Sequence, residues 1–400
     1  MIDSVYLDHN ATTPIHPEVL EAMQTCYQSH PGNAASPHSL GRQSRAILEG
    51  AREQIAEMLG ARLTGSRPDR LLFTSGGTES NNLALKGMAG LADSRIIVSA
   101  IEHPSVRLAA DELSRRGTDV VWLPVDPSGI VSTDGLADLC TSGTCLISVM
   151  LGNNETGILQ PVREIVERNA AGVSVHTDAV QVVGKLNVHF RDLGVSALSF
   201  SAHKFHGPMG IGGLLVRHDV ALQPQLHGGA QQMRLRPGTE PVALAVGMCK
   251  ALELWHADPA GNAQRLSGLR DRFESQLRNQ LPWIVVHGRD QPRLPHTSNI
   301  SFPGLDRQAL LIALDLAGVA CSTGSACTSG SSEPSPVLIA MGCSEELFGS
   351  SLRFSLGMGS GAQEVDLATS RICNVANELR NGLRTGKSPS RSRGAASKRL

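Results

Sequence analysis

Aromatic residues are scarce in this chain, where they make up 3% of the 400 residues. So few rings argue against a nucleic-acid platform built on base stacking. The formal net charge of −1 argues against broad binding to nucleic acid or to a membrane surface. No apolar run approaches the roughly 18 residues that a membrane helix needs. The opening MIDSVYLDHN also lacks the charged and apolar regions of a signal peptide, so we expect no export.

Closely paired cysteines are absent as well, because none of the eight cysteines forms a Cys-x-x-Cys pair. We therefore expect reduced thiols and a cytoplasmic protein. Two of the cysteines, Cys321 and Cys327, lie in the stretch CSTGSACTSGSSEPSPV at 321–337. This stretch is rich in Ser, Gly and Thr and has no helical or strand period, which predicts a mobile loop. Cysteine is normally among the most buried residue types, so an exposed loop is an unusual position for a thiol.

Short β-rich segments alternate with amphipathic helical segments between residues 70 and 216. This alternation predicts an α/β fold with a mostly parallel, seven-stranded sheet covered by helices on both faces. The expected strands are 70–75, 95–100, 120–125, 145–150, 173–178, 197–202 and 210–216.

The pattern changes after Leu244 to long helices followed by separate strands, which predicts a smaller α+β domain. Its expected strands are 284–288, 297–302 and 350–357, with a helix at 309–318. We expect a large domain over 15–255 and a small domain built from 1–14 and 256–384. Residues 385–400 carry five basic side chains and no acidic one, so they form either a disordered tail or a partner-binding tail.

Polar side chains follow five of the expected strands, at the point where each strand ends. They are Gly77-Thr78, Glu102-His103, Asn153-Asn154-Glu155, Asp178 with Gln181, and His203-Lys204. Because ligands in open α/β sheets bind beyond the carboxyl ends of the strands, these side chains predict one site.

The first of these groups, in TSGGTES, is a glycine-rich turn that enters a helix. Unpaired N–H groups and the helix dipole favour an anion there, most often phosphate. The alternative is a tight turn in which Thr78 only caps the helix.

Lys204 follows a buried strand, so its amine should project into the site. A partly desolvated lysine has a lowered pKa and is a candidate for forming a Schiff base. The alternative is an ion pair with Asp178 or Glu155. His203 and His206 beside it lack a matching third ligand, so we expect no metal site.

Asp178 in VHTDAVQ is expected to be buried, and a buried carboxylate needs a partner. A protonated pyridine nitrogen would serve, because the carboxylate keeps that ring cationic. His103 would stack on such a ring, or it would only cap the helix that starts at Pro104. Together these features predict a pyridoxal 5′-phosphate (PLP) site.

These same motifs carry a family resemblance. The chain resembles the NifS/IscS-type cysteine desulfurases, in the class V aminotransferase group of fold-type I PLP enzymes, from residue 6 to residue 357. The matching stretches are LDHNATTP, TSGGTESNN, NNETG, HTDAVQ, SAHKFHGP, RPGTE, GSACTSGSSEPSPVL and LRFSLG.

The resemblance implies a role for each of these positions. Lys204 would hold PLP as a Schiff base and move protons at the substrate Cα, while Asp178, His103 and Gln181 would bind the ring. Asn154 and Arg353 would hold the substrate, with Asn154 also near the cofactor and Arg353 on the α-carboxylate. The phosphate would be bound by Gly77, Thr78, Ser201, His203 and, across a homodimer interface, Thr239.

Cys327 matches the family's sulfur-accepting cysteine. The implied reaction converts L-cysteine to L-alanine and leaves a persulfide on Cys327, from which an acceptor protein takes sulfur for iron–sulfur clusters, other thio-cofactors or tRNA. Two positions depart from the family pattern. Cys321 stands where a serine or another small residue is expected, either as a neutral change or as a second thiol able to pair with Cys327. Gln232 stands where glutamate is expected.

The same PLP residues also suit a selenocysteine lyase or another class V PLP lyase or aminotransferase, for which Cys327 would matter less. A partner-binding protein that kept the fold without catalysis is the alternative from a different class. The presence of Lys204, Asp178, His103 and Arg353 argues against it.

Overall fold

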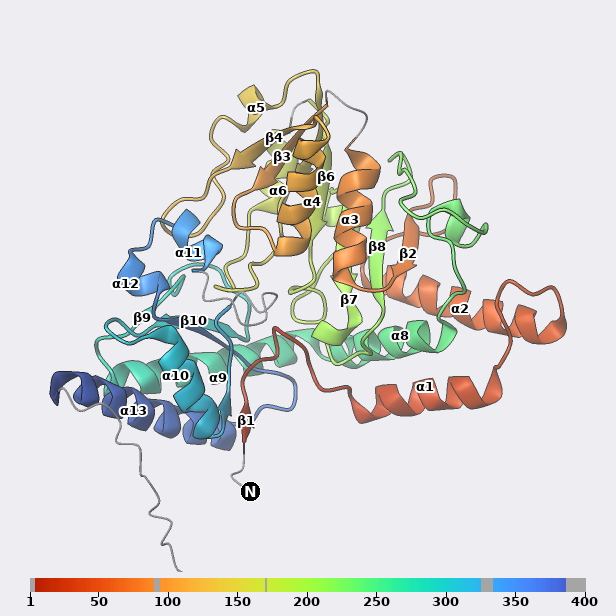
Figure 1. The fold of residues 1–400 in the computed structure, drawn as a ribbon. Helices are drawn as coiled ribbons and strands as arrows, with labels where there is room; N and C mark the ends of the chain where they lie inside the picture. The colour runs from red at the N-terminus through yellow and green to blue at the C-terminus, as the bar shows by residue number, and fades with distance from the viewer. Residues whose placement is uncertain (1–3, 90–93, 170, 325–333, 386–400) are drawn as a thin grey trace, which may run out of the picture.

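The computed structural model describes residues 4–89, 94–169, 171–324 and 334–385. Its centre is a seven-stranded sheet in the order β2-β8-β7-β6-β5-β3-β4 (Figure 1). The strands are β2 (Arg70–Thr74), β3 (Arg95–Ser99), β4 (Asp119–Leu123), β5 (Thr144–Ser148), β6 (Ser174–Asp178), β7 (Ala197–Ser201) and β8 (Gly212–Val216). β8 runs antiparallel to the other six strands of this sheet. The predicted fold class and all seven predicted strands are confirmed.

Helices cover both faces of this sheet, and the strand sequences show why. Successive side chains of a strand point to opposite faces, so Leu71 and Phe73 of β2 join one buried cluster while Leu72 joins another. The cluster of Leu71 also holds side chains of α2 (Ser39–Met58), α6 (Val162–Arg168) and α8 (Val242–His256). The other cluster holds side chains of α3 (Gly77–Met88) and α4 (Pro104–Arg115).

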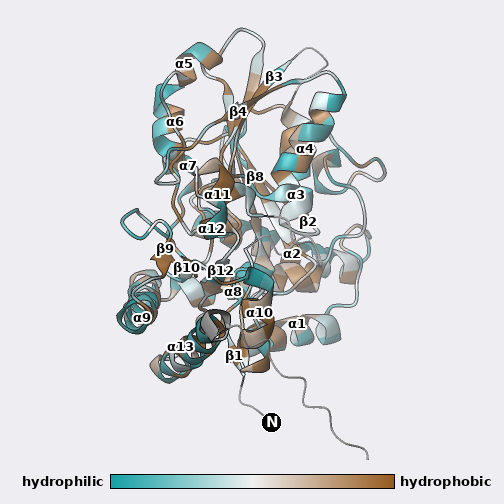
Figure 2. Cartoon of the chain, turned by 60° about the vertical axis from the view of Figure 1, so that its left-hand side comes forward, coloured by the Kyte–Doolittle hydropathy of each residue, from teal (hydrophilic) through white to brown (hydrophobic). Residues whose placement is uncertain are grey.

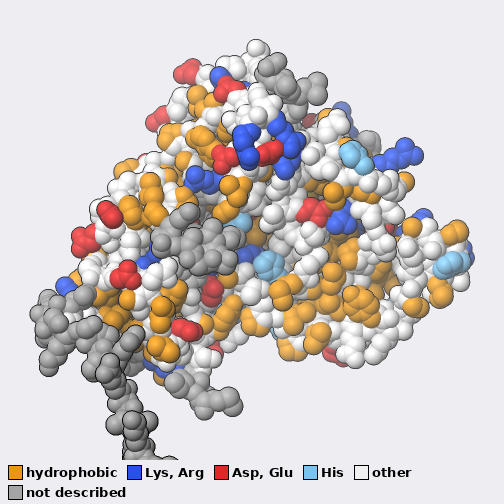
Figure 3. All heavy atoms as spheres, viewed as in Figure 1, with side chains coloured by type: hydrophobic (Ala, Val, Ile, Leu, Met, Phe, Trp, Pro, Cys, Tyr) orange, Lys and Arg blue, Asp and Glu red, His pale blue; other side chains and the backbone are white. Residues whose placement is uncertain are grey.

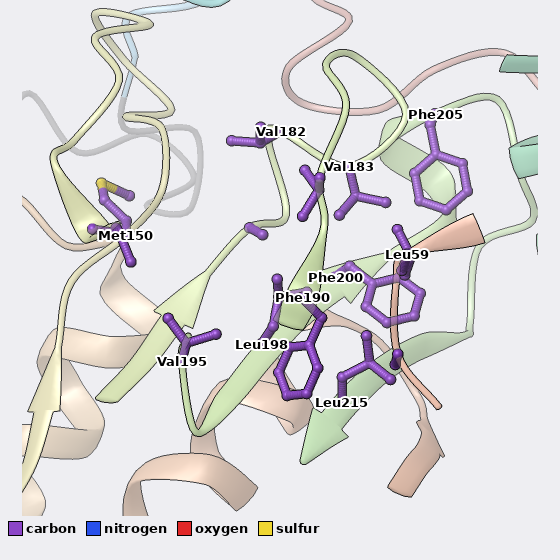
Figure 4. Packing of buried hydrophobic residues seen from close by; sticks show 14 of the residues in the cluster. Leu59, Met150, Val182, Val183, Phe190, Val195, Leu198, Phe200, Phe205 and Leu215 are labelled. Atoms are coloured by element: carbon purple, nitrogen blue, oxygen red, sulfur yellow. The ribbon is translucent and has the colours of Figure 1, made fainter. Parts of the chain in front are cut away.

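Part of the larger cluster lies beneath the loop that follows β7. Phe200 and Leu198 of β7 pack with Phe190 of α7 (Phe190–Leu193) and Leu215 of β8 (Figure 4). The strands of the central sheet are mostly hydrophobic, whereas α9 and α13 carry many hydrophilic residues (Figure 2). A sheet buried on both faces is what the continuously apolar strands predicted.

The C-terminal part of the chain forms a second layer around a three-stranded antiparallel sheet, β12-β10-β9. Its elements are α9 (Pro259–Gln280), β9 (Val285–Val286), β10 (Thr297–Ser301), α10 (Arg307–Leu316), β11 (Val319–Ala320), α11 (Pro336–Ala340), α12 (Glu345–Phe348), β12 (Ser351–Ser355) and α13 (Ala362–Thr385). The N-terminal strand β1 (Val5–Tyr6) pairs with β11, and Val5 and Leu7 join the core of this part. The segment then leads into α1 (Pro17–Ser29), which packs on α8.

The predicted loop over 321–337 needs a correction at its end. Pro336 and Val337 belong to α11, because Ser335 caps that helix by accepting a hydrogen bond from the Leu338 N–H at 3.1 Å. Residues 325–333 lie outside the described part of the chain, as does the predicted tail after Thr385. The domain boundaries stay a prediction.

The visible surface in Figure 3 carries acidic and basic side chains interspersed over one face. Several ion pairs of the described residues lie within one helix, such as Arg115 with Glu112 of α4 at 2.9 Å. Within the described ranges, no helix combines the length and the apolar character that crossing a membrane requires.

Candidate active site

The carboxyl ends of the strands open into one cavity of about 340 Å³. Ten of the twelve residues predicted for the site line it. They are Gly77, Thr78, His103, Asn154, Asp178, Gln181, Ser201, His203, Lys204 and Arg353. The structure therefore brings together side chains that lie between Gly77 and Arg353 in the sequence.

Two predicted site residues are not among the cavity lining. Thr239 is exposed and lies on the segment between η2 (Gln232–Arg234) and α8. Cys327 lies outside the described residues. Its described neighbours along the chain, Gly324 and Pro336, both line the cavity.

Lys204 ends a single 3₁₀ turn, η1 (Ala202–Lys204), directly after β7. Its Nζ donates hydrogen bonds to the carbonyl oxygens of Asn10 at 2.6 Å and Ala11 at 2.8 Å. These carbonyls belong to the N-terminal segment, which crosses the cavity after β1. The N-terminal segment, almost 200 residues away in the sequence, thus holds the lysine at the carboxyl ends of the strands.

Asp178 is the last residue of β6 and is 5% exposed. Its carboxylate accepts hydrogen bonds from the Asn81 side chain at 2.6 Å and from the Val180 N–H at 2.9 Å. Burial raises the pKa of Asp178, while the two donors and the positive charge of Lys204 act in the opposite direction. A cationic partner in the cavity would favour the ionised carboxylate.

His103 combines the two roles that the sequence left open. It is the N-cap of α4, because its Nδ1 accepts a hydrogen bond from the Ser105 N–H at 3.1 Å, and its ring also lines the cavity. Burial lowers the pKa of His103 to about 4, with further lowering by the charges of Lys204 and Arg353. The imidazole is therefore neutral at neutral pH and presents a flat, uncharged face.

The start of α3 is built to accept an anion. Its N-cap is Gly76, without a side-chain cap, so the alternative in which Thr78 caps the helix is wrong. Gly77 lies so close to Val180 that an added Cβ would be 2.7 Å from a Val180 methyl carbon. The Ser201 hydroxyl nearby is buried and has no hydrogen-bond partner within the described ranges. Together the helix start and this hydroxyl form a polar recess that suits a phosphate.

Arg353, on β12, brings the C-terminal part into the site and is 2% exposed. Its guanidinium donates to Asp8 Oδ1 at 2.8 Å and to the carbonyl oxygens of Asn154 and Gly324 at 3.0 Å each. Its Nε is buried without a partner in the described part of the chain. A carboxylate bound in the cavity would find this donor already oriented.

Five further polar residues line the cavity: Asn10, Asn81, Glu102, Ser105 and Glu155. Glu102 and Glu155 were predicted at strand ends that face the site, whereas the sequence supplied no role for the other three. Asn10 and Asn81 lie inside motifs that were recognised as a whole, LDHNATTP and TSGGTESNN, and no local signal separates them from their neighbours.

Glu102 is a second carboxyl group in the wall of the cavity. Its Oε1 accepts hydrogen bonds from Ser99 Oγ at 2.7 Å and the Met150 N–H at 2.6 Å. Burial is the main cause that raises the pKa of Glu102 to about 8, and the charge of Asp178 adds to it. Glu102 is therefore mostly protonated at neutral pH, because burial and the charge of Asp178 both disfavour its ionised form.

The histidines beside Lys204 have structural partners. His206 Nδ1 donates to the Pro14 carbonyl at 2.8 Å, and its Nε2 accepts from the Met358 N–H at 3.1 Å. His203 pairs through Nδ1 with Thr12 Oγ1 at 3.2 Å. Among the described residues, no group of three or more His, Cys, Asp or Glu side chains is arranged to hold a metal ion.

Cys321 packs against the C-terminal core and is only partly exposed. Burial raises the pKa of the Cys321 thiol, and the negative charge of Asp8 raises it further. A thiol in this setting is a poor nucleophile, because the thiolate is the reactive form. This supports the interpretation of Cys321 as a neutral change.

Comparison with known proteins gives consistent matches along nearly the whole chain. A family model described as aminotransferase class-V matches residues 5–367. The chain is 40% identical to a cysteine desulfurase IscS from Dictyoglomus turgidum, covering 94% of this chain and 95% of the relative. It is 43% identical to an IscS-like cysteine desulfurase from Mycobacterium tuberculosis, covering 91% and 94%. The solved structure of a NifS-like protein from Rickettsia africae superposes with a TM-score of 0.85 at 31% identity, covering 94% and 99%.

Proposed function

The chain belongs to the aminotransferase class-V family, and from that premise we propose that it is a PLP-dependent cysteine desulfurase. It converts L-cysteine to L-alanine and transfers the sulfur to Cys327. The observation that carries the proposal is the convergence of Lys204, Asp178, His103 and Arg353 on one cavity.

The residues of the cavity fit PLP. Ser201 Oγ and Gln181 Oε1 are buried without hydrogen-bond partners within the described ranges. An unsatisfied buried polar group costs about 1–3 kcal/mol, so a ligand that supplies partners is favoured. The phosphate of PLP supplies them beside Ser201 and the α3 N-terminus, and the ring hydroxyl supplies one for Gln181.

In this arrangement each group binds one part of the cofactor. The backbone of Gly77 and Thr78 binds the phosphate together with Ser201 and His203. Asp178 would pair with the pyridine nitrogen, the neutral His103 ring would stack on the pyridine, and Gln181 would bind the hydroxyl. Lys204 would hold the cofactor covalently.

Bound there, PLP supplies an electron sink for a carbanion at the substrate Cα. Arg353 binds the α-carboxylate and Asn154 assists it, which fixes the Cα near Lys204. The Lys204 amine then moves a proton to and from Cα, since its Nζ lies at the end of β7 inside the cavity.

Cys327 completes the reaction as the nucleophile. Its thiolate attacks the substrate Sγ, the Sγ–Cβ bond breaks, and the electron pair of that bond leaves with Cβ, which is protonated. The net products are L-alanine and a Cys327 persulfide, with no external oxidant. Cys327 lies three positions after Gly324 of the cavity wall, a reach of at most about 11 Å.

The partners follow from this chemistry. A persulfide is a transferable sulfur, so an acceptor protein collects it for iron–sulfur clusters, other thio-cofactors or tRNA. We include in the proposal a homodimer in which Thr239 reaches the phosphate of the partner subunit, since Thr239 is exposed and outside the cavity of its own chain. A cytoplasmic location is supported by the seven described cysteines, all of which are free thiols.

The test uses absorption spectra and mass spectrometry of the purified protein. We expect a PLP absorption band that is lost in Lys204→Ala, and added sulfur on the Cys327 peptide after incubation with L-cysteine. Cys327→Ala should abolish sulfur transfer, whereas the matched control Cys321→Ala should retain it.

Two other outcomes would replace the proposal. If Cys327→Ala still releases selenide from selenocysteine at the wild-type rate, the chain is a selenocysteine lyase. A protein that gains no PLP band would be a non-catalytic member of the fold.

A further inference from the structure

Glu155 lies where the described ends of the segment 325–333 come together. It belongs to the turn after β5, is 3% exposed, and lines the cavity. None of the proposed steps uses its carboxyl group.

The residue before the segment, Gly324, rests against the Glu155 carboxyl group. An added Cβ at Gly324 would be 3.0 Å from Glu155 Oε2, and the glycine has a φ of +94°. The Gly324 carbonyl is held from the other side by the Arg353 guanidinium at 3.0 Å. A larger residue at Gly324 would be strained and would push against Glu155.

The chain after the segment is bound by the same oxygen of Glu155. Ser335 is fully buried, and its hydroxyl donates to Glu155 Oε2 at 2.5 Å. The same hydroxyl accepts the Leu338 N–H and so caps α11. Glu155 therefore fixes the start of the helix that leads away from the segment.

Glu155 itself is held rigidly by the turn that carries it. Asn153 Oδ1 accepts hydrogen bonds from the N–H groups of Glu155 and Thr156, both at 2.9 Å. Asn153 is in turn anchored through its Nδ2 to the Ile101 carbonyl at 3.1 Å. The backbone of Glu155 is thus anchored through Asn153 to the chain just after β3.

The polar and charged groups around Glu155 all act on its pKa in the same direction. Burial raises the pKa of Glu155, while the Ser335 hydroxyl and the positive charges of Arg353, Arg307 and Arg107 oppose that rise. An amide at this position keeps an oxygen that can accept the Ser335 hydrogen bond, so glutamine is a conservative replacement.

We propose that Glu155 is a positioning residue for the sulfur-accepting cysteine: it binds Ser335 after the segment that carries Cys327 and packs against Gly324 before that segment. This role rests on the proposed function. Glu155 acts through Gly324 and Ser335, and it affects the transfer of sulfur without changing how tightly the substrate binds.

The test separates substrate binding from sulfur transfer in the PLP-loaded enzyme. The spectral change on adding L-cysteine gives the dissociation constant, and rapid quenching with mass spectrometry gives the rate of sulfur addition to Cys327. We expect Glu155→Ala and Ser335→Ala each to slow that rate roughly tenfold, with the dissociation constant within about twofold of wild type. Glu155→Gln should restore most of the rate.

Two further variants sharpen the result. The double variant Glu155→Ala/Ser335→Ala should be no slower than either single one, because both remove the same contact. Asp306→Ala removes the N-cap of α10, where Asp306 accepts from the Ala309 N–H at 2.8 Å, and should leave the rate unchanged. It controls for the loss of a helix cap as such.

Several results would overturn the inference. An unchanged transfer rate in Glu155→Ala, or a loss of cysteine binding as large as the loss in rate, would contradict a positioning role. If the alanine variants unfold, Glu155→Gln becomes the test. A slow rate of sulfur transfer in folded Glu155→Gln would show that more than the hydrogen bond to Ser335 is needed. Absence of sulfur on Cys327 in the wild-type enzyme would remove the proposed function itself.

Discussion

At the scale of single residues, Asn81 connects two groups that the sequence assigned separately. Its Nδ2 donates to Asp178 at 2.6 Å and to Ser105 Oγ at 2.9 Å, and that hydroxyl is 2.7 Å from His103 Nδ1. Asp178 and His103, for which we propose roles on the PLP ring, thus share one hydrogen-bonded chain. The Asn81 amide opposes the pKa rise of Asp178 caused by burial, together with the Val180 N–H and the charge of Lys204.

Replacing Asn81 with alanine should weaken PLP binding roughly tenfold, since a hydrogen bond to a charged group is lost. Loss of this donor raises the pKa of Asp178 further, so the ionised fraction of the carboxylate falls. The defect should therefore be larger at pH 6 than at pH 8.5. Fluorescence titration of the apoprotein with PLP over this pH range measures it.

Asn82→Ala is the matched control, because Asn82 bonds to the backbone carbonyls of Thr78 and Ser105 and not to Asp178. Equal PLP affinities of Asn81→Ala and wild type across the pH range would contradict the assigned role.

At the scale of elements, the side chain of Gln232 pairs with the backbone of the edge strand β2. The Gln232 amide accepts the Phe73 N–H and donates to the Phe73 carbonyl, both at 2.7 Å. One side chain thereby pairs with the open edge of the sheet as a neighbouring strand would. A glutamate, expected from the family pattern, only accepts in its ionised form, so the amide suits this double contact. Gln232, Met233 and Arg234 all have positive φ, so this contact is held against backbone strain.

Gln232→Ala should lower the free energy of unfolding by about 1–3 kcal/mol, because two buried backbone groups of β2 lose their partners. Urea denaturation followed by circular dichroism measures the change. The neighbouring variant Gln231→Ala, whose contact with the Gly238 N–H is exposed, should change stability much less. Similar losses for both variants would show that the edge contact is not the cause.

At the scale of the whole molecule, partly and fully buried histidines make the stability depend on pH. Burial lowers the pKa of each of seven histidines: His9, His103, His176, His203, His206, His287 and His296. They are neutral in the folded protein at neutral pH. Unfolding frees them to bind protons near pH 6.5, the usual value for histidine.

Stability should therefore fall as the pH is lowered from about 6.5 toward 4, because the unfolded chain binds more protons than the folded one in this window. Each such histidine contributes at most about 1.4 kcal/mol per pH unit. His287, whose pKa burial lowers to about 4, lies away from the cavity and bonds to Ser301 Oγ at 2.6 Å. We expect His287→Gln to reduce the slope of the melting temperature between pH 7 and pH 5.

The exposed variant His227→Gln controls for the change of residue type. If the slope of His287→Gln equals that of the wild type, this histidine does not contribute to acid destabilisation.

Local patterns in the sequence predicted the seven strands, with the end of each one within two residues of its observed position. Apolar runs such as those ending at Asp178 and Ser201 are short and bounded by turn residues, and such signals act over a few residues. The rule that ligands bind beyond the carboxyl ends of strands then placed ten residues in one cavity. The exact extent of the short strand β9 and the start of α11 were predicted less well, because tertiary contacts set them.

The sequence by itself determined the α/β architecture and the chemistry of the cavity, because both depend on residue types at strand ends. Only the tertiary structure decided the contacts of Asn81 with Asp178, Gln232 with Phe73, and Glu155 with Ser335. These partners are 97, 159 and 180 positions apart. Hydrogen bonds over such separations form only when the whole chain is packed, and no local pattern encodes them.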